Sequence, residues 1–342
     1  MTPDELRTRL EMFIQAQTDT SVTVDALAPL AGGASRESWD VQLRLNGRPE
    51  RLVLRRDLLT TMYERALTRD QEFDLVQAAY HSGVLAPRPR WSSAGSDALG
   101  SPFFLVDYVE GVSIGRQVVR APELAAARDA LPEQMAEQLA RIHAIDPNAH
   151  GLDFLPAPRP GFSPAQEAVA QVRELLDALA DTLDIANPVF EFGLRWAEHH
   201  LPNSSRVTVV HGDFRLGNLI VGPEGLRAII DWEFGHLGDP LEELGYLCMR
   251  DWRFGVGHLR LSGLCPREPF IAAYERCSGQ AVDRAAVDWW EIMGNLRWGV
   301  VCLAQANRHL SGFDRSVEYA SLGRRSAEMQ LELLRLIDDR EP

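Results

Sequence analysis

The chain has 342 residues, of which 45% are hydrophobic and 25% charged, and its formal net charge is −14. This length and apolar content are enough for a sizeable core and favour two domains or two lobes. The acidic balance argues against nucleic acid as a partner, because binding to a phosphate backbone depends on clustered positive charge.

The sequence has no segment typical of membrane insertion or export. It contains no run of about 18 uncharged apolar residues, and the N-terminal stretch MTPDELRTRLEMFIQ has acids where a signal peptide would need a basic start. The four cysteines form no C-x-x-C pair, so neither a disulfide framework nor a zinc ribbon is supported. We therefore expect a soluble, cytoplasmic protein with reduced cysteines and no membrane partner.

All 35 basic residues are arginine, and the sequence contains no lysine. This excludes the lysine-bearing phosphate loop G-x-x-x-x-G-K and every mechanism that needs a Schiff-base lysine. Any contact with a phosphate group must therefore come from arginine or from the backbone.

The first third of the chain is predicted to form a small antiparallel sheet with helices. The segment TPDE at residues 2–5 has a threonine cap, a proline in the first turn and a glutamate three residues after the cap, which predicts a helix to about residue 17. The dipeptide Asn-Gly in NGRP is a strong signal for a hairpin turn between two strands. Apolar residues at helical spacing predict a further helix within residues 61–83. The predicted strands are SVTVDALAPL, SWDVQLRL, ERLVLRR, APRPRW and PFFLVDYVEG.

After residue 111 the pattern changes to long helical stretches. Short apolar segments interrupt them around a polar loop, and we interpret the proline-rich stretch at residues 153–164 as a connection inside this helical part and not as a domain linker. The predicted helices cover 121–145, 163–182 and 187–200, and others start at about 240, 268 and 284 and continue to the end.

The polar loop lies in VVHGDFRLGNLIV, residues 209–221, and carries more polar groups than a turn needs. Its Asp213 and Asn218 lie five residues apart, and Asp231 follows the next apolar segment, LRAII. The ends of neighbouring strands would then hold two carboxylates and an amide oxygen on one rim. Such hard oxygen ligands suit Mg²⁺, which completes its shell with water and substrate phosphates, while a separate carboxylate can accept a hydroxyl proton. Phosphoryl transfer needs these groups and little else.

The segment HGDFRLGN resembles the H-G-D-x-x-x-x-N catalytic loop of the aminoglycoside phosphotransferase and choline kinase group, relatives of the protein kinases. The segment IIDWE, thirteen residues beyond Asn218, resembles the metal-binding segment of that group. The resemblance implies that Asp213 is the catalytic base and that Asn218 and Asp231 are Mg²⁺ ligands. It also implies that Asp239, in GDPLEELGYL, braces the catalytic loop.

The same resemblance assigns nucleotide contacts in the first third of the chain. The segment AGGASRES stands where the family has its phosphate-covering hairpin, which implicates Gly33 and Ser35. The segment LVDYVEG looks like the hinge behind the adenine, which implicates Asp107 and Val109.

Arg55, in LVLRR, stands at the position of the strand lysine that binds the α and β phosphates in the family. Arginine retains the charge and can bind phosphate with two donors, but with a different geometry. Since its neighbour Arg56 must point to the opposite face of the strand, we expect Arg55 to point inward. Glu72 falls in the helix that supplies the carboxylate partner, with Glu64 and Asp70 as alternatives.

The resemblance spans nearly the whole chain and implies an α+β, two-lobed, protein-kinase-like fold. Residues 1–108 would be the N-lobe, a nucleotide-covering antiparallel sheet plus helix, and residues 109–342 a larger helical C-lobe with the catalytic loop and acceptor site. The chain most resembles the branch that includes the kinase-like domain fused to acyl-CoA dehydrogenases. The segments that carry this likeness are LARIHAID, LRWAEHHLP, FIAAYERCSG, NLRWGVVCLAQANRHLSG and SLGRR.

We therefore expect a kinase that uses ATP or GTP and Mg²⁺ to phosphorylate a small-molecule hydroxyl group. The acceptor implied by the branch is a hydroxyacyl-CoA or a hydroxy acid. One alternative is an aminoglycoside O-phosphotransferase, and a second is a nucleotide-binding pseudokinase, which retention of all three catalytic oxygen groups argues against. The pattern favours no particular oligomeric state.

Other polar residues have competing interpretations. His211 is expected to hold backbone carbonyls and not to move a proton. His199 and His200 diverge by about 100° on a helix and offer no tetrahedral zinc site with His211. A further group near the C-terminus is explained equally well by core packing or by a substrate pocket; its members are Arg297, Trp298, Gln305 and Arg308.

Overall fold

The computed structural model describes residues 1–30, 36–57, 66–183, 186–203, 206–313 and 315–340. By its internal contacts the chain divides into two compact units. Unit 1 comprises Met1–Pro156 and His211–His236, and unit 2 comprises Ala157–Val210 and Leu237–Pro342.

A five-stranded antiparallel sheet forms the first part of unit 1, with the strand order β1-β2-β3-β5-β4. All the strands predicted in this region are confirmed. Their bounds are β1 (Val22–Pro29), β2 (Arg36–Leu45), β3 (Arg48–Asp57), β4 (Pro89–Ser93) and β5 (Phe103–Asp107).

The predicted hairpin joins β2 and β3. Asn46 and Gly47 both have positive φ, 49° and 77°, as the two-residue turn with the twist of flanking strands requires. The register that follows pairs Arg55 with Ser38 of β2 and with Phe104 of β5.

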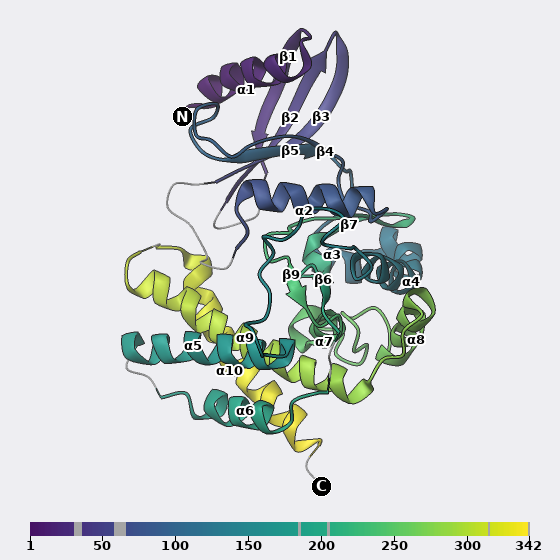
Figure 1. Cartoon of the computed structure of the whole chain (residues 1–342), viewed down its shortest axis with the longest axis vertical. Coiled ribbons are helices and arrows are strands. Elements are labelled where there is room, and N and C mark those ends of the chain that lie inside the picture. Colours follow the sequence, from purple (N-terminus) through teal and green to yellow (C-terminus); the bar gives the residue numbers. More distant parts are fainter. Residues whose placement is uncertain (31–35, 58–65, 184–185, 204–205, 314, 341–342) are drawn as a thin grey trace. The chain divides into compact units, whose positions relative to one another are not determined.

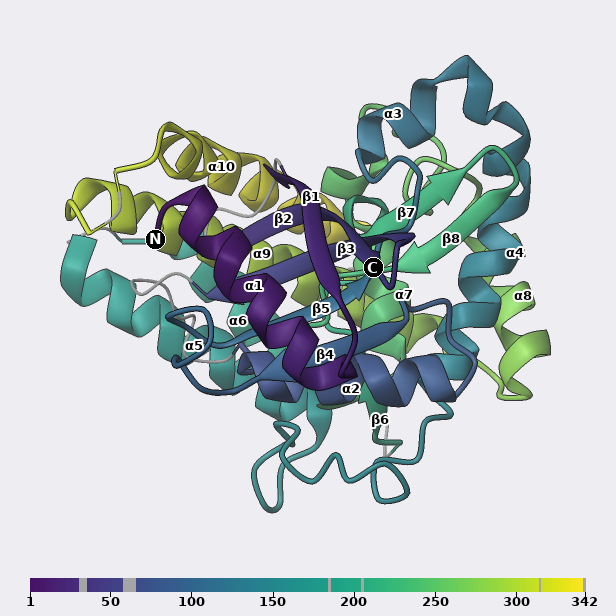
Figure 2. The ribbon, with the colours of Figure 1, turned by 90° about the horizontal axis from the view of Figure 1, so that it is seen from above.

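Helix α1 (Pro3–Thr18) covers one face of this sheet, as Figures 1 and 2 show. Thr2 and Glu5 form the predicted capping box at its start. Its buried side chains Leu6, Leu10 and Ile14 share a core with Leu52 and Leu54 of β3. Because side chains alternate along a strand, Arg55 must point to the other face.

Helix α2 (Arg69–His81) lies on that other face, where Phe73 contacts Phe104 with ring centroids 5.9 Å apart. The helix starts later than the apolar pattern suggested, because Thr68 caps it in a box with Gln71. Arg55 and Arg56 therefore face opposite sides of the sheet, as predicted: Arg56 bonds Glu37 on the α1 side, while Arg55 lies on the α2 side.

The rest of unit 1 is built around residues 211–236. Val112 forms a bridge with Val221, and α4 packs on β8. These contacts lie within unit 1, which contains residues on both sides of the predicted lobe boundary at residue 108. The elements are α3 (Gly115–Arg120), η1 (Pro122–Leu124), α4 (Ala125–Ile142), η2 (Leu216–Asn218), β7 (Leu219–Gly222) and β8 (Gly225–Ile229).

Unit 2 is mostly helical and has its own core, formed chiefly by α5, α6, α9 and α10. The helix predicted from residue 284 to the end is two helices, because Gly312 has φ of 77° and Ser316 caps α10. The elements are α5 (Pro164–Leu183), α6 (Pro188–His199), β6 (Thr208–Val210), β9 (His236–Gly238), α7 (Leu241–Cys248), η3 (Arg250–Arg253), α8 (Arg267–Ser278), α9 (Arg284–Leu310) and α10 (Val317–Asp338).

Strands β6 and β9 pair with each other in a two-stranded sheet, and β7 and β8 form another. Within the described ranges, none of the helices combines the length and the apolar character needed to span a bilayer.

Candidate active site

The loop from His211 to Asn218 makes a close backbone approach to the segment after β8. Gly212 has φ of 81°, and a Cβ at this position would lie 2.2 Å from the carbonyl oxygen of Phe234. Only glycine fits such a contact without displacing the backbone. The motif HGD therefore needs its glycine for a steric reason in addition to conformational freedom.

Asp213 lies in this loop with its carboxylate held from two sides. Asn218 Nδ2 donates to Asp213 Oδ2 at 2.7 Å and to the Asp213 carbonyl at 2.9 Å. Arg215 Nε donates to Asp213 Oδ1 at 3.0 Å. Since a carboxylate has about four acceptor positions, these bonds fix the group and leave it able to accept another proton donor.

His211 is fully buried, and both of its ring nitrogens lie within hydrogen-bond distance of backbone groups. Its Nε2 lies 3.1 Å from the carbonyl oxygen of Ile230, and its Nδ1 lies 3.2 Å from the amide nitrogen of Asp213. A carbonyl only accepts and an amide N–H only donates, so Nε2 carries the proton and Nδ1 accepts. The neutral ring thus joins the loop to β8, and it packs on Trp232 at a centroid distance of 4.6 Å.

Asp231 follows β8 and has φ of 70°, a left-handed conformation that few residues other than glycine adopt. The backbone amide of Ile230 donates to the Asn218 carbonyl at 2.9 Å, which brings the two predicted metal ligands to neighbouring chain segments. Strained backbone of this kind concentrates at functional sites.

The charge state of Asp231 is set by Arg55, whose Nη2 donates to Asp231 Oδ1 at 2.6 Å. Burial alone raises the pKa of this carboxyl, but the Arg55 guanidinium, with help from Arg215, lowers it to about 2. Asp231 is therefore a carboxylate at neutral pH, as a metal ligand must be.

Arg55 binds a second acid, Glu72, whose Oε1 lies 3.3 Å from Nη1. Burial lowers the pKa of Arg55, but the charges of Glu72 and Asp231 raise it above the ordinary arginine value. The alternative Asp70 is exposed and bonds Thr68 at 2.7 Å, and Glu64 lies outside the described residues. The structure thus pairs Arg55 with Glu72.

The other predicted nucleotide contacts are placed only in part. Gly33 and Ser35 lie outside the described residues. Asp107 ends β5, where its carboxylate accepts from Arg90 Nη1 at 2.7 Å. Val109 follows two residues later and is half-buried.

Two arginines of this region were not assigned a role from the sequence. Arg215 contacts Asp213 directly, and Arg69 is completely buried against Glu72. Arg215 stands two residues after Asp213, and Arg69 stands three residues before Glu72 on a helix, a spacing at which side chains meet. These two spacings are the sequence features from which the two contacts could have been predicted.

Several polar residues considered from the sequence lie in unit 2. Asp239 accepts from the Leu241 amide at 2.9 Å and from Trp290 Nε1 at 3.1 Å. His199 and His200 use Nδ1 on backbone carbonyls of α6.

The C-terminal polar group is engaged in several different contacts. Trp298 Nε1 donates to Asp251 at 2.6 Å, and Arg297 lies 4.0 Å from Glu242. Gln305 is buried, and Arg308 lies over the rings of Phe313 and Tyr319. These contacts favour packing within unit 2 over a common substrate pocket.

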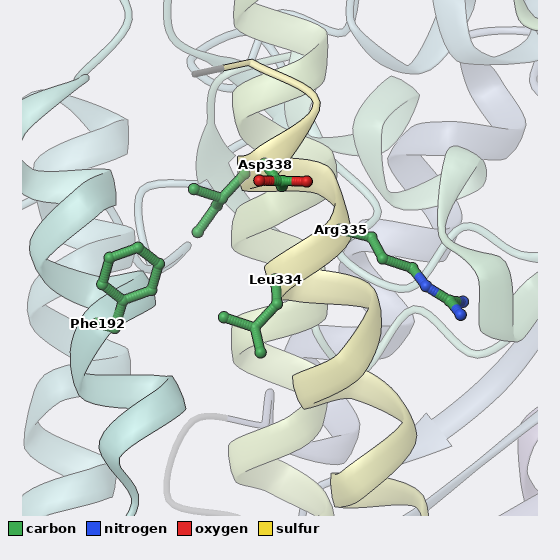
Figure 3. A pocket seen from close by; sticks show the side chains of 5 residues that line it. Phe192, Leu334, Arg335 and Asp338 are labelled. Atoms are coloured by element: carbon green, nitrogen blue, oxygen red, sulfur yellow. The ribbon is translucent and has the colours of Figure 1, made fainter. Parts of the chain in front are cut away.

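A surface pocket of about 350 Å³ lies between α6 and α10 in unit 2. Figure 3 shows the Phe192 ring directed from α6 toward Leu334 and Asp338 of α10, whereas Arg335 points away from Phe192. None of the predicted site residues lines this pocket, so the chemistry argued from the loop does not depend on it.

Part of this chain is similar in sequence to a curated relative. Acyl-CoA dehydrogenase family member 10 of Mus musculus is 33% identical over 204 residues, which cover 58% of this chain and 18% of that protein. The chain therefore spans less than a fifth of the length of that relative.

Solved structures share the fold. A Ralstonia eutropha protein with a proposed assignment as an aminoglycoside phosphotransferase superposes with a TM-score of 0.75 at 19% identity, over 97% of this chain and 98% of that chain. The GDP complex of aminoglycoside 2'-phosphotransferase-IIIa gives 0.59 at 15% identity, over 95% and 97%. The predicted α+β, kinase-like fold class is confirmed.

The sequence model of the phosphotransferase enzyme family matches residues 26–290 of this chain. Since this match covers most of the 342 residues, the chain belongs to the phosphotransferase enzyme family.

Proposed function

We propose that the chain transfers the γ-phosphoryl group of ATP or GTP to a small-molecule hydroxyl with the help of Mg²⁺. The observation that carries this proposal is the set of contacts within unit 1 that joins Arg55, Asp231, Asn218 and Asp213. A cation for phosphate, oxygen ligands for a metal and a carboxylate for the acceptor are the parts that phosphoryl transfer requires.

Asn218 and Asp231 fit a magnesium ion by the chemistry of their donors. Asn218 turns its amide nitrogen toward Asp213, which leaves the amide oxygen on the other side of the side chain. Asp231 is ionised and its side chain is 31% exposed, so a ligand can reach it. One carboxylate and one amide oxygen suit Mg²⁺, which takes its other ligands from water and phosphate. The ion would neutralise charge that develops on the transferred group.

Asp213 would orient the acceptor hydroxyl and accept its proton. The Asn218 bond fixes the direction of the carboxylate, and Arg215 stabilises its charged form.

Arg55 would bind the α and β phosphates, with Glu72 holding it in place. On binding, the nucleotide phosphates would replace Asp231 as the partner of Arg55 Nη2, while Glu72 retains Nη1. Gly33 and Ser35 would cover the phosphates. Asp107 and Val109 would form the hinge beside the base.

We propose a hydroxyacyl-CoA or a hydroxy acid as the acceptor. The supporting observation is the similarity to a protein named as an acyl-CoA dehydrogenase family member. Exposed arginines in the C-terminal part, such as Arg315 and Arg324, could bind CoA phosphates. The alternative, an aminoglycoside, is supported by the names of the solved structures. A cytoplasmic location agrees with the four free cysteines.

A screen with labelled ATP and Mg²⁺ tests the function and the acceptor together. The panel contains hydroxyacyl-CoAs, hydroxy acids, aminoglycosides and choline-like amines. We expect label in a hydroxyacyl-CoA or hydroxy acid. Label only in aminoglycosides would replace the proposed acceptor, and nucleotide binding without any labelled product would favour the pseudokinase.

The metal assignment has its own test. Asp231→Ala should lose most of the rise in melting temperature that ATP with Mg²⁺ gives the wild type, because a ligand stabilises only the state that binds it. An unchanged rise in this variant would contradict the assignment of Asp231.

A further inference from the structure

Arg69 is a buried cation in an unfavourable place. It is the first residue of α2, where the helix dipole disfavours positive charge, and its side chain is completely buried. A buried charge is tolerated only when it is paired and hydrogen-bonded. The groups that pair with Arg69 must therefore offset the cost of burying its charge.

Arg69 and Glu72 form two ion-pair links between α2 and β3. Arg55 and Asp57 are two residues apart on β3, so their side chains lie on the same face of the strand. Arg55 contacts Glu72 Oε1 at 3.3 Å, and Arg69 Nε donates to Asp57 Oδ1 at 2.7 Å. Arg69 Nη1 also donates to Glu72 Oε2. Each carboxylate oxygen of Glu72 thus has its own guanidinium.

Arg69 also reaches the segment that carries Asp231. Its Nη2 lies 3.9 Å from Glu233 Oε2, and the Leu67 amide donates to the Glu233 carbonyl at 2.8 Å. One side chain therefore contacts the strand of Arg55, the helix of Glu72 and the segment of Asp231.

A single aromatic ring supports both guanidinium groups. The Arg55 and Arg69 Cζ atoms lie 5.9 and 5.7 Å from the centre of the buried Phe104 ring. Such positions over a ring stabilise cations, and they limit the directions in which the two side chains can move.

We propose that Arg69 is a positioning residue for nucleotide binding, which acts by holding Glu72 so that Arg55 is directed to the phosphates. This inference rests on the function proposed above. Arg69 does not itself contact the nucleotide in this account. Its effect comes from geometry and from charge.

The direction of the effect follows from the charges of the cluster. Four carboxylates, those of Asp57, Glu72, Asp231 and Glu233, surround the two guanidiniums. Without Arg69, these four acids would lose one of the two guanidiniums that contact them. Arg55 would then be held more firmly by acids, and the excess negative charge would repel a nucleotide.

Two substitutions at Arg69 separate geometry from charge. Arg69→Lys keeps the charge but cannot bind two carboxylates in the same fork, whereas Arg69→Gln removes both. Arg56→Lys and Arg56→Gln are matched controls, because Arg56 bonds Glu37 at 2.9 Å from the opposite face of β3.

The measurement is the Kd for ATP with Mg²⁺ by calorimetry, below the melting temperature of each variant, with folding checked by circular dichroism. We expect Arg69→Gln to raise Kd roughly tenfold and Arg69→Lys about threefold, in the range for residues of one salt-bridge network. The Arg56 variants should bind like the wild type.

The outcomes distinguish this inference from the proposed function. If the folded Arg69 variants lose melting temperature but bind ATP like the wild type, Arg69 is merely structural and the inference is overturned. If Arg69→Gln does not fold, Arg69→Lys against Arg56→Lys decides in the same way. If the wild type binds no nucleotide, the proposed function fails first and the inference falls with it.

Discussion

Arg55 is the residue through which the absence of lysine matters most. Its fork binds Glu72 and Asp231 at once, with one terminal nitrogen for each acid. A lysine has a single nitrogen and could not hold both acids in this geometry. Arg55, the predicted phosphate-binding cation, is thus bonded directly to Asp231, the predicted metal ligand, before any ligand binds.

Arg55→Lys gives a direct test of this position, because the variant would contain a single lysine side chain in the whole chain. We expect ATP with Mg²⁺ to slow acylation of the introduced amine, since the bound phosphates would cover it. Peptide mapping by mass spectrometry separates this site from the N-terminal amine. Equal acylation with and without nucleotide would mean that position 55 does not contact the phosphates.

Gly212 is a second residue whose role is steric. Gly212→Ala should lower the free energy of unfolding by about 1–3 kcal/mol, the cost of a strained backbone, and by more where the clash with Phe234 cannot relax. Gly151→Ala is the matched control, because Gly151 has φ of 65° but no atom within 4 Å of an added Cβ. Denaturant unfolding measures both, and equal losses would show that the close approach is unimportant.

Single residues also show how far the sequence could predict the site. The spacing of Asp213, Asn218 and Asp231, and the inward direction of Arg55, follow from motif and strand alternation. Contacts between segments far apart in the sequence could not be predicted from these local patterns. Arg55 meets Asp231 across 176 residues, and a long charged side chain can choose among many acids that no local pattern ranks.

At the scale of elements, local signals predicted starts better than ends. The N-terminal cap of α1 and the turn of the β2 and β3 hairpin could be predicted because each depends on a few adjacent residues. The break between α9 and α10 was not predicted, since apolar spacing continues on both sides of it. Helix ends depend on tertiary packing as well as on sequence.

The junction of α8 and α9 depends on an ion pair that pH can break. Glu275 accepts from Arg284 Nη2 at 3.0 Å and from the Val282 amide at 2.9 Å. Its bond with Arg284, and then that with Val282, lowers the pKa of Glu275 to about 2. A lowered carboxyl pKa contributes stability above its unfolded value, and the contribution is lost as the pH falls toward the folded value.

Glu275→Gln should therefore lower the melting temperature at neutral pH, and its difference from the wild type should shrink as the pH falls from about 5 toward about 2. Thermal melts at several pH values measure this. Glu328→Gln is a control, because Glu328 is exposed and forms no ion pair with any residue that the structure describes. A constant difference across this pH range would contradict the role given to Glu275.

At the scale of the whole molecule, the residues argued to carry the chemistry belong to one compact unit. Arg55, Glu72, Asp213, Asn218 and Asp231 all lie in unit 1, although they are spread over more than half the chain. The reaction type was predictable because it depends on this small set of groups. The acceptor was not, because no motif in the sequence marks the side chains that would bind it.

The central claim is that Asp213 acts on the acceptor and not on the nucleotide. The most direct measurement is phosphoryl transfer to the acceptor found in the screen, with the Kd for ATP and Mg²⁺ measured on the same samples. For Asp213→Asn we predict that turnover falls by about 10² to 10⁴, as for loss of a positioned general base, while Kd changes little. Turnover equal to that of the wild type would contradict the account.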